Sequence, residues 1–166
     1  KNSVAQIAPR FTMKRQLDDY YDGFYNKLSE HFHVLAADNY AKAKTLAGWK
    51  AAVDSRWNAV EIVSVNAGKG LDATEAGKEY EMTVVIDEKG LDNAIGLESV
   101  IIRHEENEDR IHEVIPFSLT SKDGNLYTFK AITRMFSAGS FKQAFRMYPN
   151  HPLLPHRQDF CYVRWF

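Results

Sequence analysis

Histidine pairs are the first residues in this chain of 166 that could do chemistry. His31 and His33 stand in Glu30-His31-Phe32-His33, a spacing that would place two imidazoles on one face of a strand. The surrounding pattern instead predicts the end of a helix, where side chains two positions apart point away from each other. Zinc needs about four ligands in one place. We therefore favour a structural role for this pair over a metal site.

A second histidine pair flanks a predicted acidic turn. His104 and His112 lie on either side of a short run of carboxylates, made up of Glu105, Glu106, Glu108 and Asp109. Across a hairpin, these groups could together hold a cation weakly. The interpretation that we favour is a solvated hairpin tip whose charges protect a sheet edge.

Motifs for nucleophilic catalysis and phosphate binding are missing from the sequence. No G-x-S-x-G elbow occurs. Cys161 falls in an alternating apolar pattern, which predicts a small buried residue, and as the single cysteine it excludes an intrachain disulfide. Gly68-Lys69-Gly70 lacks the spacing of a phosphate-binding loop, so we favour a turn. We expect no catalytic, cofactor-binding or metal-binding residue in this chain.

The tryptophans are candidates for stacking against the apolar face of a sugar ring. Trp49, Trp57 and Trp165 each fall on the stripe predicted to be buried in its own element. Because burial is the commonest use of a large aromatic side chain, we favour core packing over sugar contact for all three.

Two amphipathic helices are predicted in the first third of the chain. Thr12 is the expected N-cap of the first, which runs to Leu28. Its large apolar residues recur at helical spacing, at Met13, Leu17, Tyr20, Tyr21, Phe24 and Leu28. The second runs from about Asp38 to Trp57, with a stripe at Leu46, Trp49, Val53 and Trp57. Both helices are too apolar on one side to exist alone in water, so each needs a packing partner.

After Val60 the apolar period changes to that of a strand. About seven strands are predicted, near 60–65, 80–86, 97–102, 111–119, 127–131, 141–147 and 161–165, with Pro116 indicating an edge or bulge. The fold class is therefore mainly β, an antiparallel immunoglobulin-like β-sandwich preceded by two amphipathic helices. The expected domains are a helical segment, 1–59, and a sandwich, 60–166. Helices first and strands later argue against a doubly wound parallel sheet.

The composition of the chain argues against several classes of protein. With 21 basic and 22 acidic residues, the formal net charge is -1, which argues against a protein that grips nucleic acid by its phosphates. A hydrophobic share of 45% excludes a disordered tail. No apolar run approaches the ~20 residues of a membrane span and no signal peptide opens the chain, so we expect a cytoplasmic protein without membrane partners. The chain starts at Lys1 rather than at a methionine, and we expect a fragment.

The N-terminal helix carries a recognisable run of residues. It reads Ala8-Pro9-Arg10-Phe11-Thr12-Met13-Lys14-Arg15, followed by Asp19-Tyr20 and Tyr25. This run resembles the final catalytic-domain segment of the α-glucan (glycogen/starch) phosphorylase family, in its short bacterial branch. That segment runs Pro-x-Phe-Ser/Thr-x-x-Arg, then an acidic residue and tyrosine, then a further tyrosine. Gln16 departs from the family, which often has methionine at that point.

Later parts of the chain extend the resemblance. Trp49-Lys50, Val53 and Trp57 look like the helix that follows in the family, and Gly90-Leu91 is similar to a Gly-Leu turn of its C-terminal extension. The closing residues resemble the last two strands of that extension. They are Tyr148-Pro149-Asn150-His151-Pro152-Leu153-Leu154 and Tyr162-Val163-Arg164-Trp165.

The resemblance implies where the chemistry of the parent protein lies. The parent would be a glycosyltransferase that carries out phosphorolysis of α-1,4-glucan to glucose 1-phosphate with pyridoxal phosphate. The catalytic cleft and the cofactor lysine, in a Lys-x-x-Gly-Thr-Ser-Gly setting absent from this chain, would lie upstream of Lys1. No catalytic or cofactor residue is therefore carried over.

The implied role of this region is non-catalytic and structural, with the upstream catalytic domain of the same polypeptide as its partner. The alternative is a glucan-binding β-sandwich, which predicts an exposed line of aromatic side chains on one sheet face. An α-glucan and a second copy of the chain are the other candidate partners.

Overall fold

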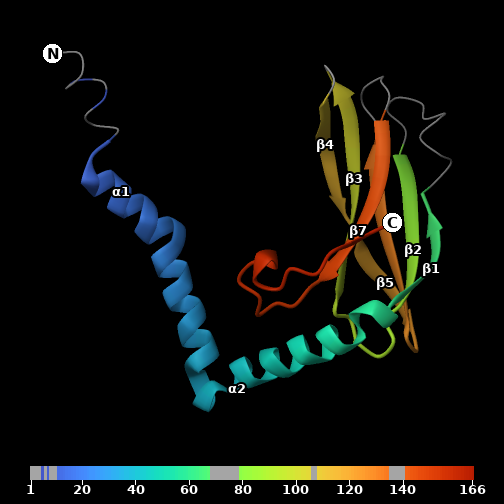
Figure 1. Cartoon of the computed structure of the whole chain (residues 1–166), viewed down its shortest axis with the longest axis horizontal. Helices are drawn as coiled ribbons and strands as arrows, with labels where there is room; N and C mark the ends of the chain where they lie inside the picture. Colours follow the sequence, from blue (N-terminus) through green and yellow to red (C-terminus); the bar gives the residue numbers. More distant parts are fainter. Residues whose placement is uncertain (1–4, 6, 8–10, 68–78, 106–107, 135–140) are drawn as a thin grey trace. The chain divides into compact units, whose positions relative to one another are not determined.

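The computed structural model describes residues 5, 7, 11–67, 79–105, 108–134 and 141–166. The chain divides into two compact units, residues 1–49 and residues 50–166, the first helical and the second mainly β (Figure 1). Four sequence features fall outside the described residues: Pro9, the turn at Gly68-Lys69-Gly70, Glu106, and the turn at 137–139.

The helical unit begins at its predicted N-cap. Thr12 Oγ1 accepts a hydrogen bond from the backbone N–H of Arg15 at 3.2 Å, and α1 (Met13–Tyr20) follows. A π-helical turn, η3 (Tyr21–Tyr25), continues into α2 (Asn26–Arg56). On the polar side of α1, Lys14 Nζ lies 2.6 Å from Asp18 Oδ2, one helical turn away. The N-cap at Thr12 is confirmed.

A break inside α2 separates the two helical stretches. Ala37 is extended, and Asp38, Asn39 and Tyr40 have φ of 52, 55 and 61°, in the left-handed region. Aspartate and asparagine tolerate this region because their short side chains bond locally, whereas a tyrosine is strained there. The first helical stretch therefore runs past its predicted end at Leu28 to this break, and the second starts close to Asp38, as predicted.

The last turns of α2 fold together with the strands of the second unit. Val53 and Trp57 are buried, and Trp57 opens the short 3-10 helix η4 (Trp57–Ala59). Arg56 Nη1 donates to the carbonyl of Gly90 at 2.9 Å, and Lys50 Nζ donates to the carbonyl of Asp159 at 3.2 Å. These contacts fix residues 50–59 to the sheet loops.

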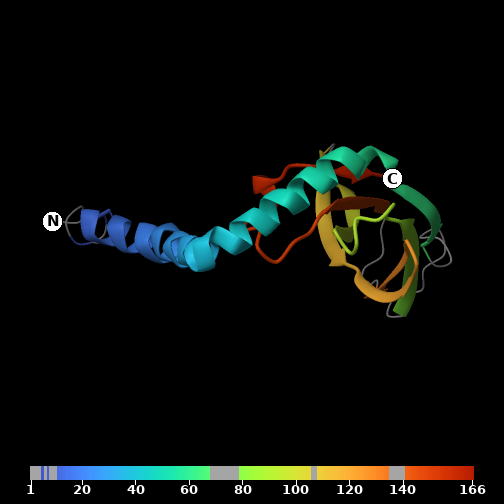
Figure 2. The same ribbon diagram turned by 90° about the horizontal axis from the view of Figure 1, so that it is seen from below.

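Two four-stranded antiparallel sheets make up the rest of the unit. The first has the order β1 (Glu61–Asn66), β2 (Glu79–Asp87), β6 (Leu126–Arg134), β5 (Ser118–Asp123). The second has the order β4 (Glu108–Pro116), β3 (Ile95–Glu105), β7 (Phe141–Pro149), β8 (Arg164–Trp165), with a 3-10 turn η6 (Arg157–Asp159) before β8. Figure 2 views these strands from a second direction. The prediction of a mainly β fold with antiparallel sheets is confirmed.

The core lies between the two sheets. Met82, Val84 and Ile86 of β2 alternate with partly exposed neighbours and are themselves fully buried, as period-2 patterning predicts. Gln143 Nε2 of β7 reaches Met82 Sδ of β2 at 2.9 Å, so the inner faces of the two sheets meet. The buried apolar residues of both sheets therefore form one sandwich core.

The strand predicted near 111–119 is two strands in different sheets, which was the main error. β4 ends at Pro116, which has no N–H to continue the ladder, and β5 starts at Ser118 in the opposite sheet. Between them, Phe117 donates its N–H to the carbonyl of Leu97 at 2.9 Å. The chain thus changes sheets at one residue, and the described part of the chain has eight strands rather than about seven.

The predicted last strand is also shorter than expected. Only Arg164 and Trp165 of the 161–165 run are β-structured, each pairing with β7. Cys161 lies before this strand and is exposed, with its thiol directed to the carbonyl of Gln158. The prediction of a buried Cys161 was wrong, because an alternating pattern at the end of a chain segment does not ensure a paired strand.

Within the described residues, none of the helices combines the length and the apolar character that crossing a membrane requires.

Candidate functional site

The first helices present a continuous apolar face to solvent. Neither α1 nor η3 contains a buried residue. The exposed fractions of the large apolar side chains range from 42% for Tyr20 to 76% for Phe11. The members of this helical apolar face are Phe11, Met13, Leu17, Tyr20, Tyr21, Phe24, Tyr25, Leu28 and Phe32. Isolated apolar side chains are common on surfaces, but a contiguous set of this kind marks an interaction site.

The π-helical turn brings the aromatic members of this face together. In such a turn the hydrogen bond runs from residue i to residue i+5, so side chains four and five positions apart both lie close to one another. The rings of Tyr20 and Tyr25 are accordingly 6.2 Å apart, those of Tyr20 and Phe24 are 6.3 Å apart, and those of Tyr21 and Tyr25 are 5.5 Å apart. The result is a broad aromatic surface.

The first histidine pair lies on one helical stretch of α2. His31 is partly exposed and His33 is exposed, and the ring of His33 contacts that of its neighbour Phe32 at 5.8 Å. Two positions correspond to opposite sides of a helix, so the imidazoles diverge.

The second histidine pair lies on the β3–β4 hairpin and is not brought together. His104 Nδ1 is 2.8 Å from Asp109 Oδ1, whose other oxygen accepts from Lys142 Nζ at 3.1 Å. His112 instead packs on the ring of Phe141, with centroids 5.2 Å apart. His104 and then Lys142 lower the pKa of Asp109. Across the described ranges, no group of three histidine, cysteine or acidic residues is placed to hold a metal.

The three tryptophans have three different environments. Trp57 is 4% exposed, as predicted, and its ring is 5.5 Å from that of Tyr162. Trp49 is only partly buried. Trp165 is 51% exposed and lies beside the guanidinium of Arg146, so its predicted place in the core was wrong. A two-residue edge strand has no second layer to cover an outward side chain.

A line of exposed aromatic side chains along the strands would have indicated glucan binding. Tyr127, Phe129 and Phe145 are buried instead. Of the strand residues that the structure describes, Trp165 is the one exposed aromatic. The sheets therefore do not favour the glucan-binding alternative.

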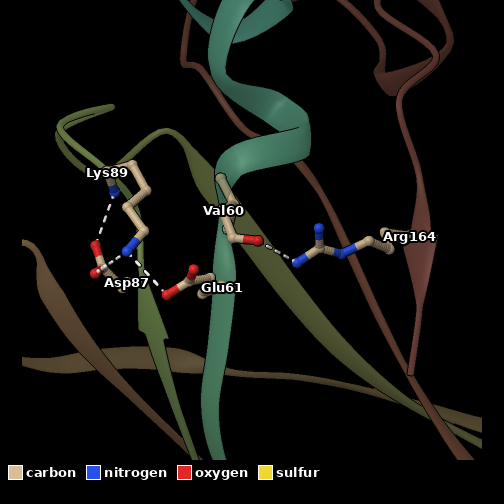
Figure 3. Close-up of polar contacts among 5 residues, drawn as sticks. All are labelled: Val60, Glu61, Asp87, Lys89 and Arg164. Carbon is tan, nitrogen blue, oxygen red and sulfur yellow. Dashed lines mark hydrogen bonds and ion pairs between the residues drawn. The ribbon is translucent and has the colours of Figure 1, made fainter.

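A group of polar contacts ties the end of the second unit to its first strand (Figure 3). Arg164 Nη2 donates to the carbonyl of Val60 at 2.6 Å, which links β8 of one sheet to the start of β1 in the other. Lys89 Nζ lies 2.7 Å from Asp87 and 2.8 Å from Glu61, which links β2 to β1. The hydrogen bonds from Lys89 lower the pKa of Asp87.

A buried carboxylate is paired with two arginines in the second unit. Glu98 of β3 is 5% exposed. Its Oε2 is 2.7 Å from Arg146 Nε, and its Oε1 is 2.6 Å from Arg157 Nη1. Arg157 also covers the ring of Tyr148, with its guanidinium carbon 4.6 Å from the centroid. Burial, followed by the negative charge of Glu98, raises the pKa of Tyr148.

These arginines line a cavity that the sequence did not reveal. Its volume is about 380 Å³, and its walls are formed by Arg146 and Tyr148 of β7 and by residues 156–158 and 161–163. Glu98, Arg146 and Arg157 are separated by 48 and 59 positions along the chain and belong to no shared motif. The pairing of β3 with β7 places Arg146 opposite Glu98, and Arg157 of η6 reaches the same carboxylate from outside the two strands.

Comparison with known proteins shows similarity to glycogen and maltodextrin phosphorylases. Residues 57–166 match the family described as the glycogen phosphorylase C-terminal domain. The chain is 27% identical over 177 aligned residues to a maltodextrin phosphorylase of Thermococcus litoralis, an alignment that covers 99% of this chain and 20% of that protein. It is 22% identical over 157 residues to glycogen phosphorylases of Mycobacterium bovis and Mycobacterium tuberculosis, covering 93% of this chain and 18% of each. The chain thus spans about a fifth of the length of these relatives.

Proposed function

This chain belongs to the glycogen phosphorylase C-terminal domain family, and on that premise we propose that it is the non-catalytic C-terminal region of an α-glucan phosphorylase-like glycosyltransferase. The whole enzyme would carry out phosphorolysis of α-1,4-glucan to glucose 1-phosphate in the cytoplasm. The names of the relatives, maltodextrin phosphorylase and glycogen phosphorylase, support this reaction class. The role assigned to the present region is structural.

The chemistry is assigned to the upstream part of the enzyme. This chain has no lysine in a Lys-x-x-Gly-Thr-Ser-Gly setting, so its own residues do not fit the attachment site of pyridoxal phosphate. When bound in the catalytic domain, that cofactor would supply a phosphate as an acid/base group. The present residues would contribute position and cover rather than proton transfer.

The observation that carries the proposal is the helical apolar face. Helices with nine large apolar side chains exposed are not stable alone in water, because most helical stability comes from packing an amphipathic face. We assign one occupant to this face, the upstream catalytic domain of the same polypeptide. The match to only 18–20% of each relative supports a large further domain in the parent.

The proposal divides the region into two roles. The helical segment, 1–59, would close the catalytic domain through Tyr20, Tyr21, Phe24 and Tyr25, and its last turns, 50–59, would join it to the sandwich. Residues 60–166 would form an accessory sandwich of immunoglobulin-like type appended to that domain. In this proposal the sandwich does not touch substrate.

The first test concerns catalysis. The isolated 166-residue chain, incubated with glycogen in phosphate buffer, is expected to release no glucose 1-phosphate, whereas the full reading frame is expected to release it. Release by the isolated chain, purified free of contaminants, would show that the non-catalytic assignment is wrong.

The second test concerns docking of the helical apolar face. In the full reading frame, the double substitution Tyr21→Asp and Phe24→Asp is expected to lower the unfolding temperature of the catalytic domain and the rate of phosphorolysis. Asn26→Asp is the matched control, since it adds a carboxylate to the same helical stretch roughly opposite Phe24. An unchanged enzyme with both apolar residues replaced would remove the proposed docking role.

A further inference from the structure

Beyond the structural role of the region, we propose that the cavity lined by Arg146 and Arg157 binds a phosphate group, either free or carried by a small sugar. The proposal rests on the second unit alone and does not depend on the identity of the parent enzyme. Its basis is the charge of the walls, the hydrogen-bond donors that they present, and the size of the space.

The first argument is charge. Among the eight residues that line the cavity, Arg146 and Arg157 carry full charges, and both are positive. They share one carboxylate, Glu98, so one positive charge remains uncompensated within this group. In the part of the chain that the structure describes, Glu98 is the one carboxylate paired with two arginines. An anion in the cavity would restore the balance.

The second argument is the supply of donors. A guanidinium has five N–H groups, yet Arg146 uses Nε and Arg157 uses Nη1 to reach Glu98. The remaining N–H groups belong to side chains that line the cavity. Two guanidinium groups with free N–H edges match the oxygens of a phosphate in geometry as well as charge.

The histidine in the wall adds a further donor. His156 Nδ1 accepts a hydrogen bond from the backbone N–H of Gln158 at 3.1 Å. In the neutral ring the proton is therefore on Nε2, and that nitrogen donates. Gln158 also lines the cavity, and its side-chain amide carries further N–H groups.

The acidic groups nearby are not among the residues that line the cavity. Asp54 accepts a hydrogen bond from the hydroxyl of Tyr162, and Asp159 Oδ2 accepts one from the backbone N–H of His156 at 3.0 Å. Neither aspartate lines the cavity, and neither does Glu98. The carboxylates thus hold the donors in place, while an entering anion meets the donors.

The third argument is size. A volume of about 380 Å³ lies within the range of roughly 300–1,000 Å³ that small-molecule sites occupy. It exceeds what a single phosphate needs, which leaves space for a sugar beside the ring of Tyr148 or Tyr162. The aromatic ring face and the C–H face of a sugar are complementary.

The experiment is a titration of the 166-residue chain followed by ¹H–¹⁵N NMR at constant ionic strength. The probes are inorganic phosphate, ribose 5-phosphate and ribose, with chloride making up the ionic strength. Saturable shifts of residues 156–163 with both phosphates are expected at millimolar concentration or below. Shifts that ribose or chloride reproduce, or none at all, would overturn the proposal.

The two phosphates distinguish the source of the ligand. Ribose 5-phosphate binding about tenfold more tightly than inorganic phosphate would identify a sugar phosphate as the occupant. Equal affinities would identify free phosphate. Either result supports a phosphate site.

Substitutions locate the site. Arg157→Gln is expected to weaken phosphate binding by about tenfold or more, since it removes a charged donor. Arg110→Gln is the matched control, because it removes another exposed arginine, from β4 and outside the cavity, and is expected to change affinity by less than about twofold. Equal affinities of the two variants would overturn the assignment.

A third variant protects the test against a loss of folding. Arg157→Lys keeps the positive charge near Glu98 and is expected to retain more affinity than Arg157→Gln, because a lysine still pairs as a point charge. Far-UV circular dichroism checks that each variant is folded. If Arg157→Gln is unfolded, the wild-type titration and Arg157→Lys decide the question.

Discussion

The two units of this chain differ in what they do with their large apolar side chains. In the second unit, Met82, Val84 and Ile86 are completely removed from solvent between two sheets. In the first, α1 and η3 bury none, and side chains as large as Phe24 are more than half exposed. Similar apolar content therefore leads to a closed core in one unit and an open face in the other.

This difference distinguishes apolar surface that stabilises its own unit from apolar surface that is available for association. Burial of apolar surface is the main favourable contribution to folding, so the second unit contains its own reason to fold. The first unit has the same kind of surface without an internal partner. We therefore expect the sandwich to fold independently, and we expect the helices to obtain their stability from the packing partner proposed above.

The largest expected effect comes from removing a large aromatic side chain from the closed core. Trp57→Ala is expected to lower the free energy of unfolding of the second unit by about 3–5 kcal/mol, because it leaves a cavity beside Tyr162. Urea denaturation followed by circular dichroism measures this. Trp165→Ala is the control, and with half of its side chain exposed it is expected to cost about 1 kcal/mol or less. Equal losses in the two variants would mean that burial does not distinguish these positions.

The next effect concerns the buried carboxylate. Glu98→Gln keeps the shape of the side chain but leaves Arg146 and Arg157 without their anion. We expect a loss of about 1–3 kcal/mol, less than for a fully buried pair because Arg157 is half exposed. Glu108→Gln breaks an exposed pair with Arg110 and is expected to cost less than about 0.5 kcal/mol. A loss no larger than this control would show that the charge of Glu98 contributes little.

A smaller effect is the pH dependence of stability. Burial raises the pKa of Glu88 above its ordinary value of 4.5, although N–H groups of Ala94 and Asn93 oppose this. The folded state therefore binds the proton more tightly than the unfolded state. The contribution of Glu88 to the free energy of unfolding is full below about pH 4.5 and is lost as the pH rises through the raised pKa.

Glu88→Gln cannot ionise, so it is expected to remove this decline in stability above pH 4.5. Asp87→Asn tests a pH dependence of stability with the opposite sign. Lys89 lowers the pKa of Asp87, so its contribution is present above pH 3.8 and is lost as the pH falls through the lowered pKa. Denaturation of the three proteins at several pH values measures both slopes. Parallel curves for Glu88→Gln and the unmodified chain would contradict the prediction.

The smallest expected effect is the sharpest test of the comparison. A chain made of residues 50–166 alone is expected to unfold cooperatively, with a free energy of unfolding within about 1 kcal/mol of the 166-residue chain. Differential scanning calorimetry measures the transition. A non-cooperative transition, or a loss of several kcal/mol, would mean that the sandwich depends on the first helices.

Local patterns were sufficient for most elements of the fold. The period of Met82, Val84 and Ile86 located β2, and Thr12 located the start of α1, because each depends on near neighbours in sequence. The predicted strand across Pro116 failed because apolar alternation continues while the chain passes from one sheet to the other. Alternation reports which side chains point inward, not which sheet receives them.

The candidate sites were harder to predict from the sequence than the elements of the fold. The helical apolar face was visible as a stripe, and its need for a partner followed directly. The cavity beside Arg157 was not, because Glu98, Arg146 and Arg157 come from separate elements. Cys161 and Trp165 were assigned to a core strand, yet the exposure of a residue at a sheet edge depends on what lies over it.

The contacts that fasten residues 50–60 to residues 159–164 have a kinetic consequence. Lys50 with Asp159, Tyr162 with Asp54, and Arg164 with Val60 join positions that are 109, 108 and 104 residues apart. Closing a loop of that length costs more entropy than closing any hairpin of the sheets, and contacts of high sequence separation slow folding. We expect these contacts between residues 50–60 and 159–164 to form after the hairpins and to break first when the domain unfolds. Substitutions such as Arg164→Ala should therefore speed unfolding and leave the folding rate nearly unchanged.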